Sequence, residues 1–205
     1  MLFRSEIMQT KETHRIFSVT NQMLTKIDGL VNTASGKSIL AKLRNSIGRP
    51  FSATTEVWAL IIEHLPEEFL GCSHRMSHEE RAILTALQLY AVHQQGLTQS
   101  VLVKNNSRFT NMGVALKALR KGDDRKSVDR RVNAMITATT FEELSYHLRH
   151  LIKLLKSKAA ETKVDYAQLA EDLYWFSRGY DENIRLAWAR AYYRQDYKGA
   201  KNNEK

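Results

Sequence analysis

The side chains that most often perform chemistry gather at one place in the first half of the chain. Cys72, His74 and His78 lie close together, and His78-Glu79 begins a pattern in which two histidines one helical turn apart bind zinc while the glutamate acts as a base. Ala82 stands where the second histidine is required, so the protease pattern is broken. A structural zinc site needs four ligands, and no second pair is spaced to supply them. We therefore expect ordinary surface residues here and no metal.

A second group is the pair His147 and His150, which are three residues apart in a predicted helix and so lie near each other. No carboxylate stands at a matching place in the sequence, which favours side chains on the flank of a helix over a catalytic or metal-binding pair. The chain also has no glycine-rich phosphate loop, no nucleophile elbow and no carboxylate cluster for metal-dependent hydrolysis. We expect a protein that is not an enzyme and that needs no cofactor.

The third candidate is a basic stretch between Lys117 and Arg131, which holds seven cations and three acids and so has a net charge of +4. Its cations are Lys117, Arg120, Lys121, Arg125, Lys126, Arg130 and Arg131. Several charges on one surface can hold a phosphate backbone without contacting any base. The alternative is that these residues only solvate the outer face of a helical bundle, with the nearby aspartates pairing locally with the arginines.

The helical repeat predicts where these charges point. Apolar residues recur at helical spacing after Lys126, and they are Val128, Val132, Met135 and Ile136. Lys126 and Arg130 then fall on the opposite face, and Arg131 borders the apolar stripe. In the preceding predicted helix the inward residues are Leu116 and Leu119, so that its cations, Lys117, Arg120 and Lys121, share the outer side. Two neighbouring helices are therefore expected to present cations outward.

The overall charge agrees with an acidic partner such as nucleic acid. The 205 residues carry a formal net charge of +9, and the sequence pI is about 9.7. The charge is segregated, since residues 37–49 contain four cations and no acid, whereas residues 56–81 have a net charge of −4. A single cysteine cannot form an internal disulfide and suits a reducing cytosol, so we expect a cytoplasmic protein. No apolar run approaches the ~20 residues of a membrane span, and the N-terminus does not resemble a signal peptide.

The elements that must position these residues are all predicted to be helices. Apolar stripes and capping residues predict helices over 13–30, 36–46, from Thr54 or Thr55 to Pro66, over 77–95, around 113–120 and 126–137, from Thr140 to about 156, and from Asp165 and Asp181 onward. No segment alternates with the period of a strand. The predicted fold is all-α, a two-lobed helical bundle of about eight to nine helices. The polar loop 97–109 is the expected boundary between an N-terminal lobe, 1–106, and a C-terminal lobe, 107–205.

Several of these stretches, in order, also carry a family resemblance. They are Leu84 to Gly96 (LTALQLYAVHQQG), Gly113 to Arg120 (GVALKALR), Val128 to Lys156 (VDRRVNAMITATTFEELSYHLRHLIKLLK) and Val164 to Ser177 (VDYAQLAEDLYWFS), preceded by Glu56 and Trp58. Together they resemble the CasB-type small subunit of the type I-E CRISPR Cascade complex, over about residues 54–193. Each stretch alone is an ordinary helix, whereas the ordered set is specific.

The resemblance implies a non-catalytic subunit, present as two copies, in an RNA-guided surveillance complex. Its implied partners are the guide RNA, the target and non-target DNA strands, a second copy of itself, and the large and backbone subunits of the complex. It implies that the subunit stabilises the R-loop by contacting the displaced strand and the guide–target duplex. Arg130, Arg131 and the cations of 117–121 fall on the family's basic segment, and Lys42 and Arg44 correspond to a basic pair in its N-terminal lobe.

The basic, all-helical sequence is also compatible with two functions other than that of a strand-binding subunit. The first is a helical protein-interaction scaffold whose basic face docks an acidic partner subunit. The second is a helix-turn-helix regulator, which would need a short turn between two helices and base-reading side chains on the second of them. The sequence contains no persuasive pair of that kind, so the scaffold is the main alternative.

Overall fold

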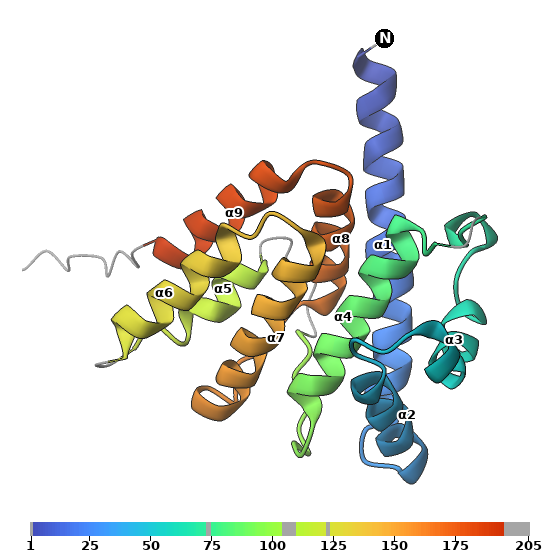
Figure 1. The fold of residues 1–205 in the computed structure, drawn as a ribbon, viewed down its shortest axis with the longest axis horizontal. Coiled ribbons are helices and arrows are strands. Elements are labelled where there is room, and N and C mark those ends of the chain that lie inside the picture. The colour runs from blue at the N-terminus through green and yellow to red at the C-terminus, as the bar shows by residue number, and fades with distance from the viewer. Residues whose placement is uncertain (1, 73–74, 104–109, 122–123, 195–205) are drawn as a thin grey trace, which may run out of the picture.

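The fold is seen in a computed structural model that describes residues 2–72, 75–103, 110–121 and 124–194. Within these residues the chain forms nine α-helices: α1 (Leu2–Gly29), α2 (Ala34–Asn45), α3 (Thr55–Ile62), α4 (His78–Gln94), α5 (Met112–Lys117), α6 (Arg125–Ile136), α7 (Phe141–Lys158), α8 (Tyr166–Ser177) and α9 (Asp181–Tyr193). Short 3-10 turns occupy Phe51–Ala53 and Glu67–Phe69. The described residues contain no strand beyond an isolated bridge between Leu102 and Val164. The predicted all-α class is confirmed (Figure 1).

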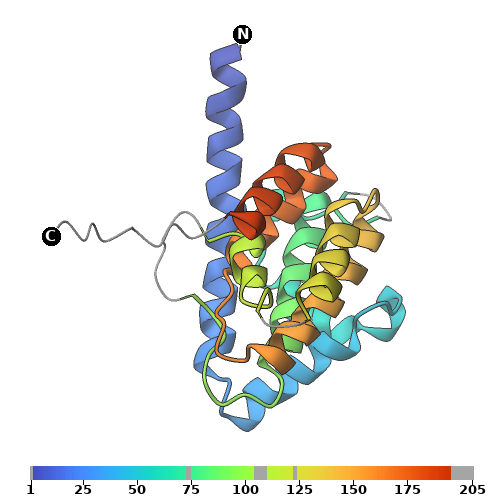
Figure 2. The same ribbon diagram turned by 90° about the vertical axis from the view of Figure 1, so that its left-hand side faces the viewer.

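Helix α4 is the centre of the fold, and it packs against α2, α7 and α8 (Figure 1). It is buried on nearly all sides, because it carries small and large apolar residues around its whole circumference. Helix α1 packs against α8 and α4, and its first half projects beyond the other helices (Figures 1 and 2). None of the helices that the structure describes is long and apolar enough to cross a membrane.

A second group of helices, α5, α6 and α9, lies on the other side of α7 (Figure 1). Helix α5 crosses α9 closely, and α6 packs along α7. The division into lobes at residues 97–109 stays a prediction, and residues 104–109 of that loop lie outside the described part of the chain. Helix α8, which follows the proposed boundary, packs mainly against α1 and α4.

Capping residues set several helix starts as the sequence predicted. At the start of α4, Ser77 Oγ accepts from the Glu80 N–H at 2.9 Å, and the Glu80 carboxylate accepts from the Ser77 N–H at 2.7 Å. Asp165 accepts from the N–H of Gln168 at 2.9 Å at the start of α8. At the start of α7, Thr140 Oγ1 accepts from the Glu143 N–H at 3.1 Å, while the Glu143 carboxylate accepts from the N–H of Thr139 at 2.8 Å.

Three helix boundaries also differ from their predicted positions, and one of them is the end of α5 at Lys117 instead of near residue 120. Helix α1 begins at Leu2 and not near residue 13, since residues 2–12 contain no proline or glycine to end it even though the apolar stripe fades there. Helix α3 ends at Ile62, before Pro66, because the ring of a proline disfavours helical backbone in the residue that precedes it.

Helix α8 buries carboxyl groups that make stability depend on pH. Asp172 accepts from Trp188 Nε1 at 2.6 Å and from Gln168 Nε2 at 3.0 Å, and burial raises its pKa to about 6. Burial, together with the charge of Asp172, raises the pKa of the neighbouring Glu171 to about 8. A carboxyl whose pKa is raised by folding disfavours the folded state once it ionises. For Glu171 the free energy of unfolding is therefore expected to fall as the pH rises from about 4.5 to about 8.

We therefore expect Glu171→Gln to stabilise the protein at alkaline pH only. The variant and the wild type should unfold with the same free energy near pH 5, and at pH 8.5 the variant should be more stable by about 2 kcal/mol, a value reduced for the partial exposure of Glu171. Urea denaturation at the two pH values measures the difference. An equal difference at both pH values would mean that ionisation of Glu171 is not its cause.

Candidate nucleic-acid interface

Helix α6 presents a cationic surface to solvent because its apolar stripe faces the core. Val128, Val132 and Met135 are buried, as the helical repeat predicted. On the opposite side Lys126, Arg130 and Arg131 are exposed, and none of the three forms an ion pair with a described residue. These three residues are called the α6 basic face below.

The acids near the α6 basic face are bound to other cations. Asp124 pairs with Lys158 of α7. Asp129 lies 3.0 Å from Arg120 Nε and 3.8 Å from Arg125 Nε. Asp123 lies outside the described residues. The two described aspartates therefore pair with other cations and do not neutralise the α6 basic face.

Arg120 is not on the outer side where the sequence placed it. Besides its bond to Asp129, its guanidinium lies 4.9 Å from the ring centre of Tyr193 and 5.5 Å from that of Tyr192. Tyr192 donates a hydrogen bond to the same carboxylate at 2.7 Å. The hydrogen bond to Asp129 raises the pKa of Arg120. The pKa of Asp129 is lowered: burial acts to raise it, but the hydrogen bonds from Arg120 and Tyr192 outweigh that effect. Arg120 thus joins α5, α6 and α9.

This arrangement predicts that Arg120 contributes to folding. Arg120→Ala should lower the free energy of unfolding by about 2 kcal/mol, because it removes a charged hydrogen bond and leaves Asp129 with a weaker partner. Arg130→Ala is the matched control on the neighbouring helix, and its exposed side chain should change stability by no more than about 0.5 kcal/mol. Thermal and urea unfolding compare the two variants. If both unfold like the wild type, the contacts of Arg120 do not stabilise the fold.

The other predicted cations are distributed over two regions. Lys121 and Arg125 are exposed beside the α6 basic face, and Lys117 is partly buried. Lys42 of α2 pairs with Glu56 at 2.8 Å. Arg44 is partly buried and donates to the carbonyl of Ala91 at 3.3 Å, and burial lowers its pKa. Because α2 packs on α4 whereas α6 packs on α7, the structure does not bring Lys42 and Arg44 onto the α6 basic face (Figure 1).

Helix α7 adds cations that the sequence reasoning did not select. Burial lowers the pKa of His150, and the positive charges of Lys153, Arg149 and Arg131 lower it further. These three cations, two on α7 and one on α6, therefore lie near His150. Lys153 is exposed. The signal available in the sequence was the spacing of Arg149 and Lys153, four residues apart on one side of a helix. The basic surface therefore continues from α6 onto α7.

The two histidines of α7, His147 and His150, contact side chains of their own helix. His147 Nε2 lies 3.9 Å from Glu143, a carboxylate that the sequence reasoning did not match to it, but Glu143 already accepts from Thr139. The ring of exposed Tyr146 lies against both histidines, 5.5 Å from that of His147 and 4.4 Å from that of His150.

Near Cys72 the residues that the structure describes form no group that could hold a metal. Cys72 is exposed, His78 Nδ1 lies 2.8 Å from Ser177 Oγ, and His74 lies outside the described residues. No three His, Cys, Asp or Glu side chains in the described part of the chain are grouped to hold a metal.

Comparison with known proteins places the chain in a family. A family model described as CRISPR-associated protein Cse2 matches residues 39–193. The crystal structure of CasB from Thermobifida fusca has a similar fold, with a TM-score of 0.68 and 24% sequence identity over 87% of this chain and 98% of that chain. No curated protein matches the sequence significantly. The family match covers the central helix α4, the α6 basic face and all of α7. The chain therefore belongs to the Cse2 family of CRISPR-associated proteins, small subunits of CRISPR Cascade complexes.

Proposed function

We propose that this chain is a non-catalytic small subunit of a type I-E Cascade complex that stabilises the R-loop in antiviral defence. In this proposal the α6 basic face holds the phosphate backbone of the displaced non-target strand, and neighbouring cations lie along the guide–target duplex. The observation that carries the proposal is the set of three exposed cations, Lys126, Arg130 and Arg131, whose neighbouring described acids are paired elsewhere.

The energetics of R-loop formation suit such a surface. The RNA–DNA duplex that forms is about as stable as the DNA duplex it replaces, so contacts to the extruded strand can shift the balance even when each is weak. Backbone contacts do so for every target sequence alike, which a guide-programmed complex requires. Arginines on the outer face of a helix provide such contacts without a helix that reads bases in a groove.

The proposal is tested in a reconstituted complex that contains two copies of this chain, its proposed stoichiometry. Complexes with the wild type and with a Lys126→Ala, Arg130→Ala, Arg131→Ala triple variant are assembled, and the lifetime of the R-loop is followed on several unrelated targets. We expect normal assembly and a shorter lifetime on every target. Failed assembly of the variant, combined with unchanged binding of the isolated chain to single strands, would instead mean that the face docks a protein subunit, as the scaffold alternative requires.

A further inference from the structure

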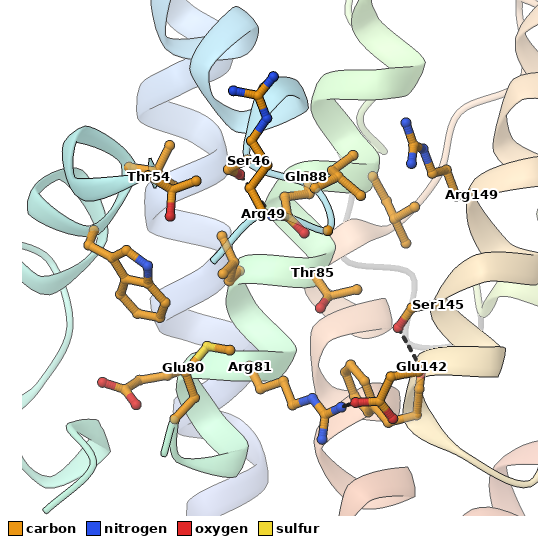
Figure 3. Close-up of a pocket in the computed structure, with 18 of the residues that line it drawn as sticks. Ser46, Arg49, Thr54, Glu80, Arg81, Thr85, Gln88, Glu142, Ser145 and Arg149 are labelled. Atoms are coloured by element: carbon orange, nitrogen blue, oxygen red, sulfur yellow. Dashed lines mark hydrogen bonds and ion pairs between the residues drawn. The ribbon is translucent and has the colours of Figure 1, made fainter. Parts of the chain in front are cut away.

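A groove that does not include the α6 basic face has no role in the function proposed above. It lies over α4, between α2 and α3 on one side and α7 on the other, and has a volume of about 1120 Å³ (Figure 3). We propose that this groove binds a protein segment of a neighbouring subunit that carries apolar side chains together with carboxylates. The proposal goes beyond strand binding and uses none of the three residues of the α6 basic face.

The lining is largely apolar and partly exposed. Ile62 at the end of α3 and Met76 before α4 are 44% and 49% exposed, although both are large hydrophobic residues. Leu84 and Leu89 of α4 contribute to the same lining. Exposed apolar side chains that line a concave surface are typical of protein-binding sites. The groove is therefore suited to apolar side chains of a partner.

The aromatic residues of the lining argue against a nucleic-acid strand. Groove binding of single strands relies on exposed rings on which bases stack. Trp58 and Phe141 are only 6% and 8% exposed, and Phe141 is covered by the guanidinium of Arg81 at 4.1 Å. Tyr146 is the exposed ring of the described lining, and it lies against His147 and His150. The exposed apolar surface is thus mainly aliphatic, which suits leucine-like side chains better than bases.

The charge of the groove indicates the second requirement of the partner. Its two glutamates are satisfied, since Glu80 caps α4 and Glu142 pairs with Arg81. Arg49, which follows α2, is exposed and forms no ion pair with a described residue. Arg149 of α7 has a buried Nε–H without a hydrogen-bond acceptor among the described residues. In Figure 3 these two arginines come from opposite sides of α4.

A buried N–H without an acceptor is unfavourable, so an incoming acceptor near Arg149 would remove that penalty. Carboxylates are the acceptors that match arginine best, because they accept two of its hydrogen bonds at once. A segment with apolar side chains against α4 and carboxylates toward Arg49 and Arg149 therefore complements both the shape and the charge of the groove.

Photo-crosslinking in the reconstituted complex, assembled without target DNA, tests the occupant directly. A photoreactive amino acid replaces Ile62 in the groove and, as a control, Leu186 of α9, which is 48% exposed and distant from the groove lining. Mass spectrometry identifies what is attached. We expect the probe at position 62 to crosslink a segment of a neighbouring subunit that contains apolar residues and Asp or Glu, and the probe at 186 not to crosslink that segment.

The charge requirement is tested in the same complex. Adding Arg149→Gln to the probe variant should lower the yield of this crosslink about tenfold, the effect expected for one charged hydrogen bond. A crosslink from position 62 to the guide RNA, to a second copy of this chain, or to nothing would overturn the proposal. None of these results depends on R-loop lifetime, so failure here is distinct from failure of the proposed function.

Discussion

Replacing Gly113 with alanine is expected to destabilise the protein by about 3 kcal/mol or more, the largest effect on stability that we predict for a single methyl group. Gly113 is buried on α5 where that helix crosses α9. A Cβ atom there would lie 2.1 Å from the carbonyl oxygen of Trp188 and 2.9 Å from its carbonyl carbon. Both are backbone atoms, so relief of the clash requires the two helices to separate.

Gly29→Ala is the matched control, since a Cβ atom at that position would meet nothing within 4 Å. Urea denaturation of the two variants gives the comparison. Gly29→Ala should change the free energy of unfolding by less than about 1 kcal/mol. If Gly113→Ala is as stable as Gly29→Ala, then α5 and α9 do not cross as closely as described here.

The second large effect concerns binding. Replacing Lys126, Arg130 and Arg131 together with alanine should weaken binding to a single strand about 100-fold near 0.1 M salt, because three phosphate contacts are removed. The loss should be the same for unrelated sequences, since backbone contacts do not read bases. Filter binding with labelled single-stranded DNA and RNA measures it. The triple variant should melt like the wild type, because all three side chains are exposed.

A control variant separates these contacts from net charge. Lys37, Lys163 and Arg178 are also exposed and lie on or beside other helices, and replacing all three with alanine removes the same charge. We expect this control to weaken binding by less than about threefold, because charges distant from a strand are screened by salt. Equal losses in both variants would show that overall charge, and not the α6 basic face, governs binding.

Features that depend on neighbouring residues could be predicted from the sequence. The helical repeat predicted that Val128, Val132 and Met135 are buried, and they are. The same repeat placed Lys126 and Arg130 on the solvent side, where both are exposed. The caps at Ser77 and Asp165 were predicted for the same reason, since each cap forms between residues three apart in sequence.

Features that depend on distant helices could not be predicted in this way. The helical repeat placed Arg120, which follows α5, on the outer side, yet Tyr192 and Tyr193, some seventy residues later, cover it when α9 packs against α5 and α6. The close approach at Gly113 has the same origin. The groove over α4 also requires α2, α3, α4 and α7 to be placed together, so the buried Nε–H of Arg149, which has no acceptor among the described residues, has no signature in the sequence.

The most direct test of strand binding by the α6 basic face is the salt dependence of single-strand affinity in the wild type and in the Lys126, Arg130, Arg131 triple variant. Each phosphate contact on a single strand contributes about 0.7 to the slope of log affinity against log salt concentration. Loss of three contacts therefore predicts a slope that is shallower by about 2, with DNA and RNA strands of any sequence. Parallel lines for the two proteins would contradict the account, because they would mean that these residues release no counterions and hold no phosphates.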